Sequence, residues 1–236
     1  LRIDYSILDQ HAESYRKIRN TFRYLLGNIN DNFETIKFDS LIVDELPELE
    51  QLMLHKIYVL NNNFKKYFND YDFHNLYKEL LNFCTLDLSS FYFDIRKDVL
   101  YCDNLNSKKR KDCVIVLNII LESLIKWFAP ILVFTTDEVF SLVNKGDRNI
   151  HECLFVKVPK SWENKKLNDK WDQLFKIKQE ANVAIEAKRS SKEIGSSLEA
   201  EVKLIVDKEK YEILKNLDLA EYLITSKAEK ELSKTA

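Results

Sequence analysis

Three arginines and an asparagine near the start of the chain are spaced so that they share one face of a helix. They are Arg16, Arg19, Asn20 and Arg23, separated by steps of three and four residues. A guanidinium can form paired hydrogen bonds with a phosphate, stack on a base or donate to a base edge, and an amide can pair with a base. The cluster predicts a surface that contacts RNA. The alternative is an ordinary charged face in solvent.

A second candidate stands where an apolar segment meets a proline. Residues 126–128, Lys-Trp-Phe, come just before Pro130. Adjacent helical residues point about 100° apart, so Trp127 and Phe128 are not expected to face the same core. One of the two rings could then stack on an unpaired base. We select Trp127 and Lys126 as candidate RNA contacts, and the alternative is that both rings fill a seam between helices.

Two further basic runs have simpler interpretations. Residues 108–111, Lys-Lys-Arg-Lys, open a predicted helix, where positive charge opposes the helix dipole. We interpret this run as a solvated helix start, with another use left open. Residues 188–192, Lys-Arg-Ser-Ser-Lys, resemble a lysine–serine ATP-binding loop only superficially, because no glycine-rich partner precedes them. We interpret them as a polar turn.

Residue types that could form a catalytic or metal site are scattered. The four histidines lie far apart, and the four cysteines contain no C-x-x-C pair. No Walker loop, H-E-x-x-H or dinucleotide-binding fingerprint is present. We therefore expect no catalytic residue, metal or cofactor in this chain. Cys84 and Cys113 lie in apolar helical stretches, which predicts buried free thiols and favours the reducing cytoplasm.

The composition restricts the fold and the partners. The 236 residues include three glycines and three prolines, where average usage is roughly 7 % and 5 %. A glycine-rich phosphate loop, a turn-rich sandwich and a Pro-rich linker are therefore not expected. Lys and Arg number 36 against 38 Asp and Glu, a net charge of −2. With no overall attraction to nucleic acid or an anionic membrane, any RNA contact must come from local clustering.

No segment predicts a membrane span or a signal peptide. The longest apolar run is interrupted by Asn118 and Glu122, whereas a span requires about twenty apolar residues. The chain opens at Leu1 in mid-pattern without a methionine, so we expect it to be part of a longer protein.

Apolar residues repeat every three or four positions along much of the chain, which predicts long amphipathic helices. The predicted helices run from Ser6 to Ile29, from Pro47 to Phe68, from Asp72 to Ile95, from Lys108 to Pro130, and through Val139 to Gly146. Residues 6–9 and 135–138 are predicted capping boxes. Together these helices predict an antiparallel bundle over residues 1–150.

The pattern changes after Gly146. Residues 153–159 predict an extended link, and a long helix is expected over 167–189. Alternating residues 198–206 predict a strand, followed by a short helix over 211–217, a second strand over 222–225 and a charged, frayed end from Lys227. The fold class is mainly α, with a helix bundle followed by a small α+β domain over residues 151–236.

Several segments together resemble the anticodon-binding region of bacterial isoleucyl-tRNA synthetases. They are residues 15–28 (YRKIRNTFRYLLGN), 87–98 (DLSSFYFDIRKD), 100–103 (LYCD), 127–132 (WFAPIL), 135–140 (TTDEVF) and 194–200 (IGSSLEA), in the same order as in that family. The similarity extends from Ile7 to about Val206. The segments at 15–28 and 87–103 are similar to the isoleucyl enzymes, and those at 127–140 are shared more loosely with the valyl and leucyl enzymes.

The resemblance implies a class I ligase that activates isoleucine with ATP and Mg and joins it to its tRNA. The family's HIGH and KMSKS signatures and its editing domain have no counterpart here, so this chain would carry tRNA binding alone. Bacterial members often end in a cysteine-rich zinc unit, which is also absent from residues 1–236. A cytoplasmic monomer with isoleucine tRNA as its partner is implied.

Carried over by residue, the helix with Arg16 and Arg19 resembles the one that relatives lay against the anticodon. Asn20 and Arg23 match its polar pair, and Trp127 lies in a helix that the family places beside the stem-loop. Two alternatives stay open. One is the same region of a valyl or other class I synthetase, and the other is a non-catalytic helical scaffold that binds protein.

Overall fold

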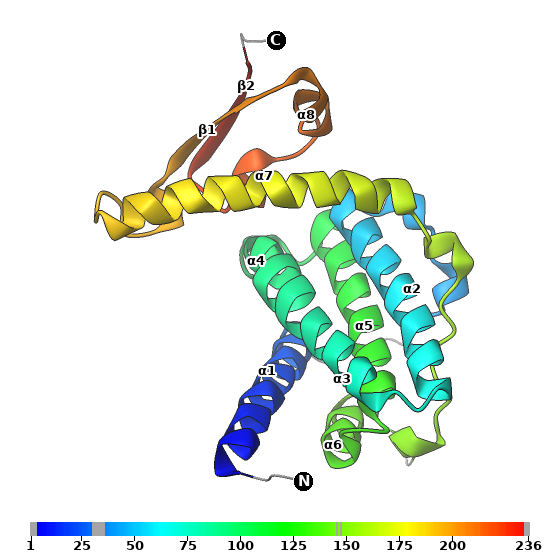
Figure 1. Cartoon of the computed structure of the whole chain (residues 1–236). Helices are drawn as coiled ribbons and strands as arrows, with labels where there is room; N and C mark the ends of the chain where they lie inside the picture. The colour runs from blue at the N-terminus through cyan, green and yellow to red at the C-terminus, as the bar shows by residue number, and fades with distance from the viewer. Residues whose placement is uncertain (1–3, 30–35, 145, 147, 234–236) are drawn as a thin grey trace. The chain divides into compact units, whose positions relative to one another are not determined.

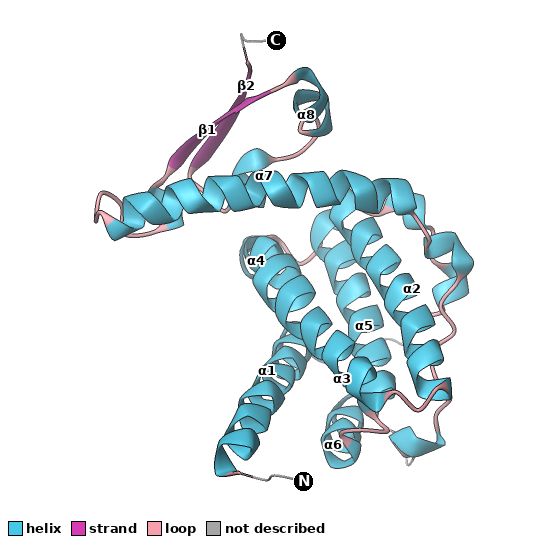
Figure 2. Ribbon diagram, in the orientation of Figure 1, coloured by secondary structure: helices cyan, strands magenta, loops and turns pink. Residues whose placement is uncertain are grey.

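The computed structural model describes residues 4–29, 36–144, 146 and 148–233, and these residues are mainly helical with a small parallel sheet (Figures 1 and 2). The mainly α prediction is therefore confirmed. The chain forms two compact units, Leu1–Glu163 and Asn164–Ala236. The assignment of residues 1–150 and 151–236 to an anticodon-binding domain and a junction domain stays a prediction.

The first unit contains the long helices expected from the apolar repeats. They are α1 (Tyr5–Ile29), α2 (Glu48–Asn69), α3 (Phe73–Asn82), the π-helical segment η3 (Phe83–Tyr92), α4 (Phe93–Cys102), α5 (Lys108–Phe128) and α6 (Val133–Val143), with short 3₁₀ turns η1 (Phe38–Ser40), η2 (Val43–Glu45), η4 (Ile150–Glu152) and η5 (Lys160–Trp162). The starts of α1, α2 and α5 lie within a residue or two of the predicted ones.

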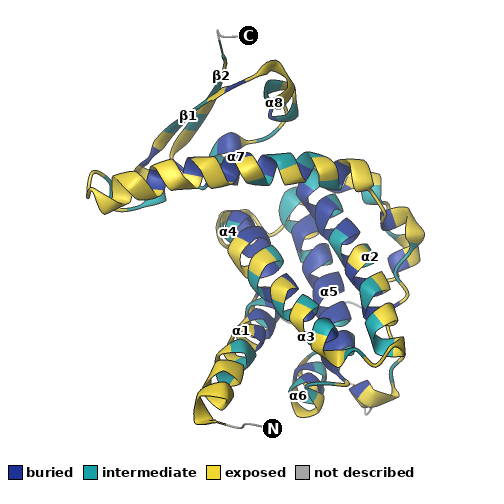
Figure 3. Cartoon of the chain, in the orientation of Figure 1, coloured by how far each residue is buried: buried dark blue, intermediate teal, exposed yellow. Residues whose placement is uncertain are grey.

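Helix α5 runs through the core of this unit, and its residues 116–121 are all buried (Figure 3). Phe22 of α1 meets Phe128 edge-on, with ring centroids 6.0 Å apart. Phe64 of α2 lies 6.1 Å from Trp127 on another side of α5. Because α5 is packed on several sides, adjacent aromatic residues can both be buried.

The third predicted helix, over residues 72–95, changes its hydrogen-bonding pattern from α-helical to π-helical and back again. It continues from α3 into α4 through η3, whose wider π-helical turns shift the register of side chains. The Ser90 hydroxyl donates to the Thr85 carbonyl, five residues earlier, at 2.8 Å. Leu76, Leu80 and Leu88 of the predicted stripe are buried.

Both predicted capping boxes are wrong. Helix α1 begins one residue before Ser6, whose N–H donates to the Asp4 carboxylate at 3.4 Å. Helix α6 begins at Val133, so Thr135 lies inside its first turn. The Thr135 hydroxyl instead lies 2.9 Å from the Tyr15 hydroxyl of α1, which makes it a contact between helices rather than a cap.

A buried ion pair joins α2 to α4. Arg96 donates from Nε to Glu50 Oε1 and from a terminal nitrogen to Oε2, both at 2.7 Å. Glu50 is 0 % exposed and Arg96 4 % exposed. The Tyr92 hydroxyl donates to Glu50 at 3.2 Å and lies 3.4 Å from Cys113 Sγ. Burial raises the pKa of the Cys113 thiol to about 12, and Cys113, like Cys84, is a buried free thiol as predicted.

The second unit consists of α7 (Lys165–Ser190), η6 (Ser197–Glu199), β1 (Glu201–Val206), α8 (Lys208–Ile213), α9 (Leu219–Leu223) and β2 (Lys227–Leu232). The two strands pair in parallel, from Glu201 opposite Lys227 to Val206 opposite Leu232. Trp171 of α7 packs edge-on against Tyr222 of α9 at 5.5 Å.

The predicted second strand at 222–225 is wrong, since Tyr222 and Leu223 lie in α9. The charged end from Lys227 was expected to fray, but Lys227–Leu232 form β2, and residues 234–236 lie outside the described residues. The Lys-Ala-Glu-Lys-Glu-Leu sequence of β2 has low strand propensity, so the pattern gave no local signal. Pairing with a distant segment compensates: Lys227 forms an ion pair with Glu201 at 2.6 Å, and Glu231 with Lys203.

Candidate nucleic-acid interface

The predicted arginine cluster is a solvent-exposed surface of α1. Arg16, Arg19, Asn20 and Arg23 are all exposed, and we call these four residues the arginine strip. On the other side of the same helix Ile18 and Leu25 are 0 % exposed and Phe22 is 2 % exposed. Because the buried residues fix the rotation of α1 against α5, the strip is held facing outward.

Most of the strip has no side-chain partner among the residues that the structure describes. Arg16 forms an ion pair with Glu13, so an acidic residue does accompany the strip on its own helix. Arg19, Asn20 and Arg23 have no side-chain hydrogen bond or ion pair to any residue that the structure describes. Their donors are therefore available to a ligand, whereas an exposed pair such as Arg16–Glu13 contributes little to stability.

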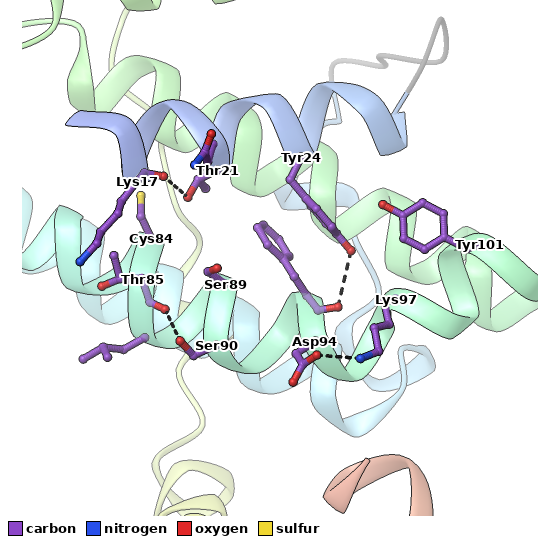
Figure 4. Close-up of a pocket in the computed structure, with 13 residues that line it drawn as sticks. Lys17, Thr21, Tyr24, Cys84, Thr85, Ser89, Ser90, Asp94, Lys97 and Tyr101 are labelled. Carbon is purple, nitrogen blue, oxygen red and sulfur yellow. Dashed lines mark hydrogen bonds and ion pairs between the residues drawn. The ribbon is translucent and has the colours of Figure 1, made fainter. Parts of the chain in front are cut away.

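A groove of about 700 Å³ lies next to the strip, between α1 and the continuous helical run of η3 and α4. Its polar and aromatic lining includes Lys17, Asn20, Tyr24, Ser89, Lys97 and Tyr101 (Figure 4). Measured around α1 at about 100° per residue, Lys17 and Tyr24 lie on one side of the buried stripe and Arg19 and Arg23 on the other. Asn20 lies between these two sides, so this residue of the strip also lines the groove.

Aromatic side chains and one ion pair shape the groove. The Tyr24 ring stacks on Phe93, with centroids 4.1 Å apart and planes 17° apart. Burial, followed by the proximity of Tyr101, raises the pKa of the Tyr24 phenol, which therefore stays neutral. The Asn28 amide donates to the Tyr101 hydroxyl at 3.4 Å, and Lys97 pairs with Asp94 at 3.0 Å.

Comparison with known proteins decides the family. Residues 50–204 match the family described as the anticodon-binding domain of tRNA ligase. The chain belongs to this family. The match begins in α2 and ends in β1, so it spans parts of both compact units and leaves out α1.

Similar curated proteins extend the comparison to α1. The chain is 64 % identical to the isoleucine–tRNA ligase of Pelagibacter ubique over 228 residues, which cover 97 % of this chain and 25 % of that protein. It is 39 % identical to the isoleucine–tRNA ligase of Bartonella henselae, over 95 % of this chain and 23 % of the relative. The chain thus spans about a quarter of the length of these relatives, and the predicted resemblance is confirmed.

Two candidates in this anticodon-binding chain lie away from the strip. Trp127 is 0 % exposed and packs near Phe64, so the prediction that its ring stacks on a base is wrong. Lys126 pairs with Glu122 at 2.7 Å and lines a separate groove with Lys37 and Arg148. On α5 it points about 160° away from Phe128, the residue that meets α1. The structure therefore does not bring Lys126 to the strip.

The other basic runs have structural contacts. Lys108 pairs with Asp112 at 2.8 Å and donates to the Glu45 carbonyl at 2.7 Å, and Arg110 donates to the Leu100 carbonyl at 3.2 Å. These contacts agree with a helix start rather than a ligand site. Residues 188–192 end α7 and enter a turn, as predicted.

Lys17, Ser89 and Tyr101 line the groove but are not among the site residues predicted from the sequence. Lys17 precedes Asn20 by one helical turn, a spacing that could have identified it. Ser89 and Tyr101 carried no such signal, because they reach the groove from segments about seventy residues away. In the described part of the chain, no three His, Cys, Asp or Glu side chains are grouped to hold a metal, and no helix there is long and apolar enough to cross a membrane.

Proposed function

We propose that this chain is the part of an isoleucine–tRNA ligase that binds the anticodon stem-loop of isoleucine tRNA. The observation that carries the proposal is the exposed side of α1, where Arg19, Asn20 and Arg23 have no partner among the described residues. Family membership and the isoleucine ligases among its relatives support the same assignment.

The chemistry of the strip suits the unpaired loop of a tRNA. Arg19 and Arg23 would attract backbone phosphates and place the loop, which fixes its position without reading sequence. Asn20 carries both a donor and an acceptor and could read the edge of a splayed base. Binding energy from the arginines and selectivity from the amide would thus come from one face of one helix.

The remainder of the reaction belongs, in this proposal, to other parts of a longer enzyme. Activation of isoleucine with ATP and Mg and any zinc unit would lie outside the 236 residues. The helical unit would be the antiparallel bundle of the anticodon-binding domain, and the protein would act as a cytoplasmic monomer. Within this chain, the role of the strip would be to bind the tRNA.

Binding of the chain to an isoleucine tRNA transcript is expected to weaken steeply as salt concentration rises. If three or four cations of α1 contact phosphates, the slope of log affinity against log salt is roughly −2 to −3. Fluorescence anisotropy at several salt concentrations measures this slope. A protein-binding scaffold would give no salt-sensitive association with tRNA, and that result would refute the proposal.

A further inference from the structure

Strand β1 pairs with β2 along one edge, and its other edge has no strand beside it in the described part of the chain (Figure 2). The Ser233 N–H donates to the Val206 carbonyl at 2.8 Å, so Val206 and every second residue before it bond toward β2. Because backbone groups alternate along a strand, those of Glu201, Lys203 and Ile205 point away from β2. No described residue forms a hydrogen bond to these outward N–H and C=O groups.

The sequence of β1 lacks the features that usually keep an exposed strand edge from pairing. Proteins block such edges with proline or with free charges. Residues 201–206, Glu-Val-Lys-Leu-Ile-Val, contain no proline. The side chains of Glu201 and Lys203 are already engaged by β2, in ion pairs with Lys227 at 2.6 Å and with Glu231. The outer edge of β1 is therefore suited to pairing with another strand.

An apolar groove of about 650 Å³ runs along this strand. All six residues of β1 line it and no residue of β2 does, which places it on the free side of β1. Across the groove lie Ile177, Ala181, Ala184 and Ile185, which repeat at helical spacing on α7. The two alanines are too short to fill the space between helix and strand. The groove therefore joins an apolar side of α7 to the free edge of β1.

We propose that this groove receives a third β-strand, supplied by another segment of the longer ligase. The inference rests on the part of the proposed function that makes this chain a piece of an isoleucine–tRNA ligase. The chain spans about a quarter of the relatives that it resembles, so most of the longer enzyme is available to supply the segment. A parallel sheet of two strands would thereby gain a third strand and a cover for its apolar face.

The chemistry of the groove specifies an extended polypeptide. Its backbone would pair with the outward N–H and C=O groups of β1, which an apolar small molecule cannot do. Every second side chain of the added strand would point toward α7 and would be apolar, and the side chains between them would face solvent. A second copy of the chain is the other possible source of a strand, and the test separates the two.

The test compares hydrogen exchange in the 236-residue chain with exchange in the complete ligase that contains it. The amides of Lys203 and Ile205 are expected to exchange about 100-fold or more slowly in the complete ligase, because only there do they donate to a strand. The amides of Val202 and Leu204 point toward β2 and serve as the internal reference, protected in both proteins. Mass spectrometry with fragmentation resolves these single amides.

Two tryptophan variants of the complete ligase locate the strand. Ala184→Trp fills the groove from an exposed position of α7 and is expected to restore fast exchange at Lys203 and Ile205. Val183→Trp is the matched control, because Val183 is the neighbouring residue, is 73 % exposed and does not line the groove. It is expected to leave both amides protected. Circular dichroism establishes that both variants are folded.

Three results would overturn the proposal. The first is equal exchange of Lys203 and Ile205 in the chain and in the complete ligase, and the second is continued protection of both amides in folded Ala184→Trp. The third is slow exchange of both amides in a 236-residue chain that sediments as a dimer, because the strand would then come from a second copy. None of these measurements involves tRNA, so the proposed function is decided separately by the salt dependence of tRNA binding.

Discussion

Replacing Glu50 with alanine is expected to lower the free energy of unfolding by about 3–5 kcal/mol. The Arg96 guanidinium, 4 % exposed, would lose both of its 2.7 Å hydrogen bonds to this carboxylate. The Tyr92 hydroxyl would lose its acceptor as well. An uncompensated buried charge costs far more than the net contribution of the pair, and urea denaturation measures the loss.

A double variant separates charge burial from packing. Glu50→Met combined with Arg96→Met removes both charges and keeps apolar volume, and it is expected to be much closer to the original stability than Glu50→Ala. If Glu50→Ala alone unfolds at the original urea midpoint, the ion pair does not hold α2 to α4. If the double variant loses as much stability as the single one, packing rather than charge is responsible.

Reversing two charges of the arginine strip is expected to weaken tRNA binding about 100-fold or more. Arg19→Glu with Arg23→Glu removes two charge-assisted contacts, each worth about 1.5–3 kcal/mol, and adds repulsion from phosphate. Both side chains are exposed and have no partner in the described part of the chain, so the melting temperature should change little. Anisotropy titration with an isoleucine tRNA transcript measures the loss.

The matched control reverses two lysines of α2. Lys65→Glu with Lys66→Glu gives the same change in net charge at exposed positions away from the strip. It is expected to weaken binding by no more than a few-fold, through long-range charge alone. Equal losses in the two double variants would show that binding follows net charge, and the α1 surface would have no special role.

The strip could be predicted from the sequence because the buried and the exposed residues of α1 both follow the same local spacing of three and four residues. Ile18, Phe22 and Leu25 define the buried side, and Arg19 is exposed because it lies about 100° around the helix from Ile18. Trp127 could not be placed in this way. Helix α5 is buried on nearly every side. The prediction for Trp127 assumed that one side of this helix faces solvent, and that assumption does not apply here.

Features that form between segments far apart in the sequence could not be predicted from local sequence patterns. Strand β2 has a charged sequence and exists because it pairs with β1, twenty-six residues earlier at Glu201 and Lys227. The groove brings Asn20 to Ser89 only when α1 packs beside η3. The buried charge of Glu50 likewise has no local signal, because its partner Arg96 lies in another helix.

The most direct test of anticodon recognition compares two tRNAs with one protein. The chain is titrated with an isoleucine tRNA transcript and with the same transcript carrying the valine anticodon, at one salt concentration. We predict binding of the isoleucine anticodon about tenfold tighter, since one base loses its stacking or edge contacts in the exchanged tRNA. Equal affinity for the two transcripts would contradict anticodon reading by this chain and would leave it a binder of tRNA backbone alone.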